Sequence, residues 1–202
     1  MIPVQYKIST KQNLPLLQHI KIALNADCKW IQLRTHQEEG PSWIDTLTQI
    51  KTLCREEEAT FIIEDQIDLV KAIDGDGIHI TTAKSLLEVR QQLGEGFLIG
   101  ADATDAEDII RKKQQSADYL CYGPFTPTPD ETSKKDLQNF KETIQLIENK
   151  DVFLPICAYG MIGTEDVHPI LETGMRGISI SIDQEDINET LVTTTLNRFL
   201  TL

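Results

Sequence analysis

The chain has 202 residues, 40% hydrophobic and 25% charged, a composition typical of one globular domain that can bury a sizeable core. Its 32 acidic residues outnumber its 19 basic residues, and the formal net charge of -13 makes nucleic acids and anionic membranes poor partners. The first ten residues, MIPVQYKIST, show no signal-peptide pattern, and no apolar run is long enough to span a membrane, so we expect a cytoplasmic protein.

Short apolar strands alternate with amphipathic helices along the chain. In order, the predicted strands are 4–9, 30–34, 61–64, 77–80, 97–100, 118–122, 152–158 and 177–181. The predicted helices are 14–24, 42–54, 67–73, 85–93, 106–115, 138–147, 164–172 and 187–200. Gly123-Pro124 is expected to end the sixth strand, because proline cannot donate to a strand ladder. Thr164 begins a run typical of a helix N-terminal cap.

This repeated order predicts a single TIM (β/α)8 barrel that covers residues 1–202, with helices around a ring of parallel strands. Many of the strands are almost continuously apolar, as expected for parallel strands that are buried on both faces. A flavodoxin-like open sheet is the alternative fold, but it would leave about three predicted strands without a place.

The cysteines and histidines carry weaker signals. The four cysteines form no CxxC pair, which favours buried structural thiols in a reducing compartment over disulfides or a metal site. His79 lies within a strand and is expected to be a hydrogen-bonded structural residue rather than a base. His19 and His168 fall on predicted helices and are expected at the surface.

Ligand sites of this fold lie at the carboxyl ends of the strands, where this chain places several polar residues. Backbone amides near Gly160 and Ser181, after the last two strands, could receive a phosphate. The long loop 126–135 carries hydroxyls and two lysines, which suits anion binding, although a solvated surface loop is the alternative interpretation. Further residues at these strand ends are Gln32, Arg34, Glu64, Asp65, His79, Thr81, Thr82, Asp102 and Ser179.

Five segments together resemble the thiamine phosphate synthase family in order and spacing. They are WIQLR at 30–34, Glu64-Asp65, DGDGIHI at 74–80, ADYLCYGPF at 117–125 and LPICAYGMI at 154–162. ETGMRGISIS also resembles the last strand of that family. The resemblance implies a TIM barrel that joins hydroxymethylpyrimidine diphosphate to hydroxyethylthiazole phosphate. It also implies release of pyrophosphate with the help of Mg²⁺.

The resemblance assigns roles to individual residues. Arg34 and Lys134 would neutralise the departing diphosphate, and Asp65 would bind Mg²⁺. The substrate-binding residues would be Gln32, Glu64, Asp102, Thr128, Thr132, Gly160 and Ser181. The implied partners are phosphorylated small molecules, and the resemblance leaves a homo-oligomer open.

The chain departs from the family pattern at the metal and diphosphate positions. Lys84 occupies the position of a second metal-binding aspartate of the family, and His36 that of a lysine. Glu64 replaces an asparagine of the family, and Asp102 replaces a serine. A lysine ammonium does not reproduce a bridging divalent ion. A silent paralogue that binds a thiamine precursor or a protein partner is therefore an alternative, as is a barrel enzyme acting on another phosphorylated small molecule.

Overall fold

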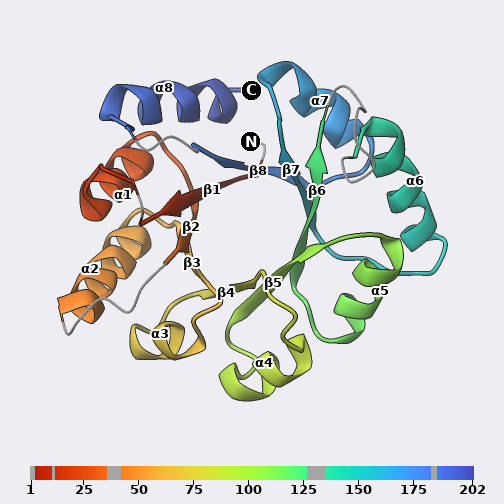
Figure 1. Cartoon of the computed structure of the whole chain (residues 1–202), viewed down its shortest axis with the longest axis horizontal. Coiled ribbons are helices and arrows are strands. Elements are labelled where there is room, and N and C mark those ends of the chain that lie inside the picture. The colour runs from red at the N-terminus through yellow and green to blue at the C-terminus, as the bar shows by residue number, and fades with distance from the viewer. Residues whose placement is uncertain (1–2, 11, 36–41, 127–134, 183–185) are drawn as a thin grey trace.

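The computed structural model describes residues 3–10, 12–35, 42–126, 135–182 and 186–202. Eight parallel strands form a closed barrel in chain order, and β1 pairs with β8 to close it (Figure 1). The strands are β1 Val4–Ser9, β2 Trp30–Arg34, β3 Thr60–Glu64, β4 Gly77–Ile80, β5 Leu98–Ala103, β6 Tyr119–Phe125, β7 Ile156–Gly160 and β8 Gly177–Ser181. This closure confirms the predicted TIM barrel and excludes the open flavodoxin-like sheet.

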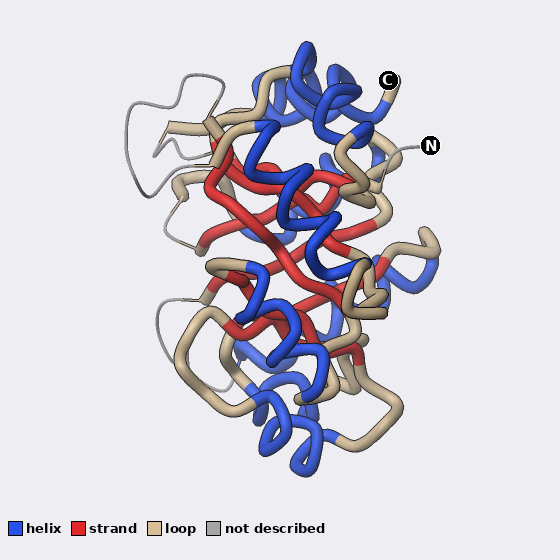
Figure 2. Tube along the Cα trace, turned by 90° about the vertical axis from the view of Figure 1, so that its right-hand side faces the viewer, coloured by secondary structure: helices blue, strands red, loops and turns tan. Residues whose placement is uncertain are grey.

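Eight helices surround the strands, and Figure 2 shows the strands inclined to one another between them. The helices are α1 Leu16–Asn25, α2 Ser42–Glu56, α3 Ile67–Ala72, α4 Leu86–Leu93, α5 Ala106–Gln114, α6 Leu137–Glu148, α7 Thr164–Glu172 and α8 Glu189–Leu200. Among these described helices, none has both the length and the apolar content needed to cross a membrane.

The side chains of each strand alternate between the helices and the barrel interior. On β2, Ile31 and Leu33 belong to the main hydrophobic core, which includes residues of the surrounding helices. Trp30 instead packs in a smaller apolar cluster with Tyr119, Cys121, Cys157 and Tyr159. Polar side chains inside the barrel, near the carboxyl ends of the strands, need hydrogen-bond partners of their own or a ligand.

The sequence predicts that the sixth strand ends at Gly123-Pro124, and this prediction is wrong. β6 continues to Phe125, which pairs with Gly160 of β7. The register between the two strands shifts between Tyr122 and Phe125, so the position without an amide hydrogen falls at an irregularity of the ladder. The longer strand brings Phe125 to the carboxyl-terminal end of the barrel, where it lines a cavity.

Other predicted boundaries also shift. β5 extends three residues beyond the predicted end, which places Asp102 inside the strand, and β7 covers 156–160 rather than 152–158. The N-cap of α7 is Gly163 rather than Thr164, and the amide of Gly163 donates to Asp166 Oδ2 (2.8 Å). α8 begins two residues later than predicted because Asn188 caps it by accepting from the Leu191 amide.

The histidine predictions give mixed results. The prediction that His19 lies at the surface is wrong, because the side chain is buried and its Nε2 lies 2.8 Å from the hydroxyl of Tyr6. Its position in α1, four residues before Ala23, places it on the apolar face of the helix. His168 is exposed, as predicted. The four cysteines are buried and free, also as predicted.

Candidate active site at the mouth of the barrel

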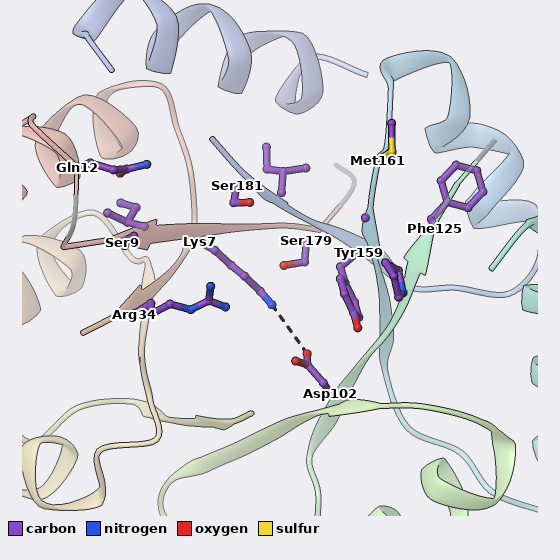
Figure 3. A pocket seen from close by; sticks show the side chains of 14 residues that line it. Lys7, Ser9, Gln12, Arg34, Asp102, Phe125, Tyr159, Met161, Ser179 and Ser181 are labelled. Atoms are coloured by element: carbon purple, nitrogen blue, oxygen red, sulfur yellow. Dashed lines mark ion pairs between the residues drawn. The ribbon is translucent and has the colours of Figure 1, made fainter. Parts of the chain in front are cut away.

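A cavity of about 350 Å³ opens at the carboxyl ends of the strands (Figure 3). Of the residues to which the family resemblance assigns a role, Arg34 of β2, Asp102 of β5, Gly160 of β7 and Ser181 of β8 line it. Strands far apart in the sequence therefore bring these four residues to one cavity, as the barrel topology predicts. Lys7, Tyr159, Met161 and Ser179 also contribute to the wall.

Arg34 is held at the mouth by two residues beneath it. Its Nε donates to Glu64 Oε2 (2.6 Å), and Gln32 Nε2 donates to the other oxygen of the same carboxylate (2.7 Å). Gln32 and Glu64 are buried, and neither is among the described residues that line the cavity. In this structure the two predicted substrate-binding residues orient Arg34, whose side chain is about half exposed.

Asp102 connects the cavity to a buried polar chain inside the barrel. His79 Nε2 lies 3.0 Å from Asp102 Oδ1, and His79 Nδ1 lies 3.1 Å from the hydroxyl of Tyr119. These contacts agree with a structural, hydrogen-bonded role for the fully buried His79. Burial alone would raise the pKa of Asp102, but the hydrogen bond from His79 and the charges of His79, Lys7 and Lys112 lower it overall. Asp102 is therefore an anion at neutral pH.

Lys7 is a cavity residue that the sequence analysis did not single out. It lies on β1 between Tyr6 and Ile8 and enters the cavity toward Asp102, with Nζ 3.9 Å from Oδ1 (Figure 3). Its ammonium also lies over the ring of Tyr159, 5.4 Å from the centroid. One feature of the sequence could have identified Lys7: it is a lysine flanked by apolar residues in a short strand. Because side chains alternate between the two faces of a strand, Lys7 faces the interior once the barrel closes.

Gly160 brings two strands into close contact at the edge of the cavity. Its φ is +135°, in a region that side-chain-bearing residues avoid. A Cβ at this position would lie 2.2 Å from the backbone nitrogen of Phe125. The glycine is therefore required by the approach of β6 to β7, in addition to any contact with a ligand.

The surroundings of Asp65 do not fit Mg²⁺, which needs several oxygen ligands in octahedral geometry. Asp65 Oδ1 accepts from the Thr81 amide and the Thr82 hydroxyl (3.1 Å each), and Oδ2 accepts from the Thr81 hydroxyl. Lys84 donates to the main-chain carbonyl of Asp65 (3.0 Å), which places a positive charge beside the site. Asp65 also lines a separate surface pocket, together with Lys84 and residues of α3 and α4.

A second possible metal site lies inside the barrel. Of the described residues, His79, Asp102 and Cys121 alone form a group of three potential ligands, with ligand atoms within 4.8 Å of one another. The Cys121 thiol donates to Gln5 Oε1 (3.3 Å), and burial raises its pKa well above the ordinary value. A protonated thiol is a poor ligand for Mg²⁺, which prefers oxygen. This group therefore does not replace the magnesium site either.

We expect Mg²⁺ at a few millimolar to leave the melting temperature of the protein unchanged relative to EDTA, because an ion that does not bind cannot stabilise the fold. Lys84→Asp restores a carboxylate beside Asp65 and should introduce a Mg²⁺-dependent rise, which thermal unfolding would detect. A rise in the wild-type protein that Asp65→Asn abolishes would contradict this account.

Three of the predicted residues, Thr128, Thr132 and Lys134, lie outside the described residues. The loop that contains them connects Thr126, which is buried, to Lys135, whose main chain pairs with that of Thr126 (2.8 Å). Their predicted roles in diphosphate and substrate binding therefore stay predictions.

An eight-stranded parallel barrel with a charged cavity at its carboxyl end belongs to the class of TIM barrels that hold small ligands at that face. A family model described as thiamine monophosphate synthase matches residues 5–182. The thiamine-phosphate synthase of Bacteroides fragilis (strain YCH46) is 34% identical over 186 residues, covering 90% of this chain and 91% of that protein. The chain therefore belongs to the thiamine phosphate synthase family.

Two further similarities agree with this placement. The thiamine-phosphate synthase of Bacteroides thetaiotaomicron is 33% identical over 188 residues, covering 90% of this chain and 88% of that protein. The structure of the thiamine phosphate pyrophosphorylase from Pyrococcus furiosus superimposes with a TM-score of 0.79 at 21% identity. It covers 98% of this chain and 94% of that chain, and at this identity it supports the fold alone.

Proposed function

We propose that the protein is a thiamine phosphate synthase that joins hydroxymethylpyrimidine diphosphate to hydroxyethylthiazole phosphate. The observation that carries the proposal is the similarity to thiamine-phosphate synthases over about nine tenths of this chain and of each of the two relatives. In this reaction the C–O bond to the diphosphate breaks, the thiazole nitrogen forms the new C–N bond, and pyrophosphate leaves. The buried free cysteines and the absence of a membrane-spanning helix among the described residues support a cytoplasmic enzyme.

The cavity supplies groups suited to these substrates. Arg34 would contact the departing diphosphate, since its guanidinium can form paired hydrogen bonds with phosphate oxygens. Gly160 and Ser181, from β7 and β8, lie where phosphate groups commonly bind in this fold. Lys134, Thr128 and Thr132 would complete the site from the loop after β6. We assign no step to a metal ion, because the residues around Asp65 do not fit one.

Incubation of the purified protein with both substrates tests this function. We expect thiamine phosphate and pyrophosphate in equal amounts, measured by chromatography and by a coupled phosphate assay, with the Bacteroides fragilis protein as the positive control. Arg34→Ala should lower kcat/KM about 10- to 100-fold, since it removes a charge that stabilises the leaving group. If no product forms although calorimetry detects binding of a substrate, the alternative of a silent, ligand-binding paralogue is correct.

A further inference from the structure

The Lys7 ammonium enters the cavity without a hydrogen-bond acceptor among the described residues. Its side chain is only 14% exposed, yet the nearest carboxylate oxygen, on Asp102, lies at 3.9 Å, beyond hydrogen-bond distance. Within the described part of the chain, no residue accepts a hydrogen bond from its ammonium, whose other contact is the ring face of Tyr159. An ammonium has three donors, and the described residues accept a hydrogen bond from none of those of Lys7.

Ser179 presents a second unsatisfied group to the same cavity. It is 3% exposed, and its hydroxyl has no hydrogen-bond partner within the described part of the chain. β1 and β8 are neighbours in the barrel, and their register pairs Gln5 with Ser179 and Lys7 with Ser181. In Figure 3, the ends of Lys7 and Ser179 point toward the same open space, from adjacent strands.

The charges around this space favour an anion. Arg34 approaches from β2, so two cationic side chains enter the cavity from neighbouring strands (Figure 3). Asp102 is the opposing anion, but its Oδ1 lies 3.9 Å from the Lys7 ammonium, so the two form an ion pair without a hydrogen bond. A hydroxyl and an ammonium together match the oxygens of a phosphate group, which accept several hydrogen bonds and carry negative charge.

We propose that Lys7 and Ser179 form a phosphate subsite that contacts phosphoryl oxygens directly, so that side-chain cations neutralise the ligand without a metal ion. The identity of the ligand rests on the proposed function: the phosphate belongs either to the diphosphate or to the thiazole phosphate. The subsite itself rests on the buried Ser179 hydroxyl without a described partner, on the Lys7 ammonium that enters the same cavity and donates to no described residue, and on the misfit of Mg²⁺ at Asp65.

Calorimetric titration in EDTA tests the subsite, with inorganic phosphate, pyrophosphate and hydroxyethylthiazole phosphate as separate probes. We expect the wild-type protein to bind at least one of them, Lys7→Met to weaken that binding about 10- to 100-fold, and Ser179→Ala about 3- to 10-fold. The probe most affected identifies which phosphate group the subsite holds. Lys29→Met is the matched control, because it removes the same charge from a lysine paired with Asp27 outside the cavity.

Thermal unfolding, read beside the titrations, separates ligand binding from a structural role. Because the Ser179 hydroxyl has no hydrogen-bond partner within the described residues, Ser179→Ala should melt at or above the wild-type temperature. Lys7→Met removes a counterion of Asp102 and should melt slightly below wild type, while its phosphate affinity falls as stated above. If Lys7 serves only as a counterion for Asp102, Lys7→Met should lower the melting temperature and leave phosphate affinity unchanged, which would overturn the proposal. Wild-type binding that occurs with Mg²⁺ but is absent in EDTA would also overturn the proposal. So would the absence of binding of all three probes.

The two proposals can fail separately. If Lys7-dependent pyrophosphate binding occurs without formation of thiamine phosphate, the subsite stands and the synthase activity does not. If thiamine phosphate forms with the same kcat/KM and the same phosphate affinity in wild type and Lys7→Met, the activity stands and the subsite does not.

Discussion

Replacing Arg34 by alanine is expected to weaken pyrophosphate binding about 10- to 100-fold and to destabilise the fold by about 2 kcal/mol. The first effect follows from the loss of a cation at the cavity. The second follows from Glu64, whose carboxylate is 4% exposed and accepts from Arg34 at 2.6 Å. Without Arg34, this buried charge keeps one described side-chain donor, Gln32. Isothermal titration measures the first effect and urea unfolding the second.

The double variant Arg34→Ala/Glu64→Gln separates these two effects. Replacing the carboxylate by a neutral amide of the same size removes the uncompensated charge, so most of the lost stability should return. Pyrophosphate affinity should stay low, because the guanidinium is still absent. If both properties return together, Arg34 acts through the fold. If the single variant binds pyrophosphate as tightly as wild type, Arg34 does not contact the ligand.

The barrel could be predicted from the sequence because its signal is repeated eight times, and an error in one element does not change the whole. Individual strand ends are less certain. Asp102 is an example: aspartate is disfavoured in strands, and the predicted strand stops at Gly100. In the structure the hydrogen bond from His79 and the nearby ammonium of Lys7 compensate the carboxylate, so β5 continues through it.

The site is harder to predict than the fold because its contacts join neighbouring strands. The pairing of Arg34 with Glu64 depends on the register of β2 and β3, in which Leu33 lies opposite Ile63. A sequence alone does not give that register. Lys7 was overlooked for a related reason, since a lysine in a strand is ordinarily a solvent-facing residue and becomes an interior one only when β1 pairs with both β2 and β8.

The burial of His19 was not predicted: the sequence analysis expected this histidine at the surface, although its spacing in the helix matches that of the apolar residues. A histidine is usually placed on the exposed side of a helix, but α1 buries His19 together with Ile20, Ala23 and Leu24. Burial lowers the pKa of His19 from 6.5 to about 4, because the charged imidazolium is poorly solvated there. The histidine is therefore neutral in the folded protein over a range of pH in which it is protonated in the unfolded chain.

This difference predicts a loss of stability in mild acid. Between about pH 6.5 and pH 4 the unfolded chain binds a proton that the folded protein does not, so the free energy of unfolding falls as the pH falls. The full contribution of neutral His19 to the free energy of unfolding, about 3 kcal/mol, is present above pH 6.5 and is lost near pH 4. Urea unfolding of wild type and His19→Gln at several pH values isolates it from the titration of the many carboxylates that both proteins share.

The variant should be less stable than wild type at pH 7.5, because it loses the packing of the ring and its contact with Tyr6. The difference between the two proteins should then narrow by about 3 kcal/mol on going to pH 4, since the wild type alone loses the contribution of His19. His168→Gln, which removes an exposed histidine of α7, is the matched control and should follow the wild-type curve. A stability difference that stays constant with pH would mean that burial of His19 does not disfavour its protonation, and acid sensitivity would then have to come from the carboxylates.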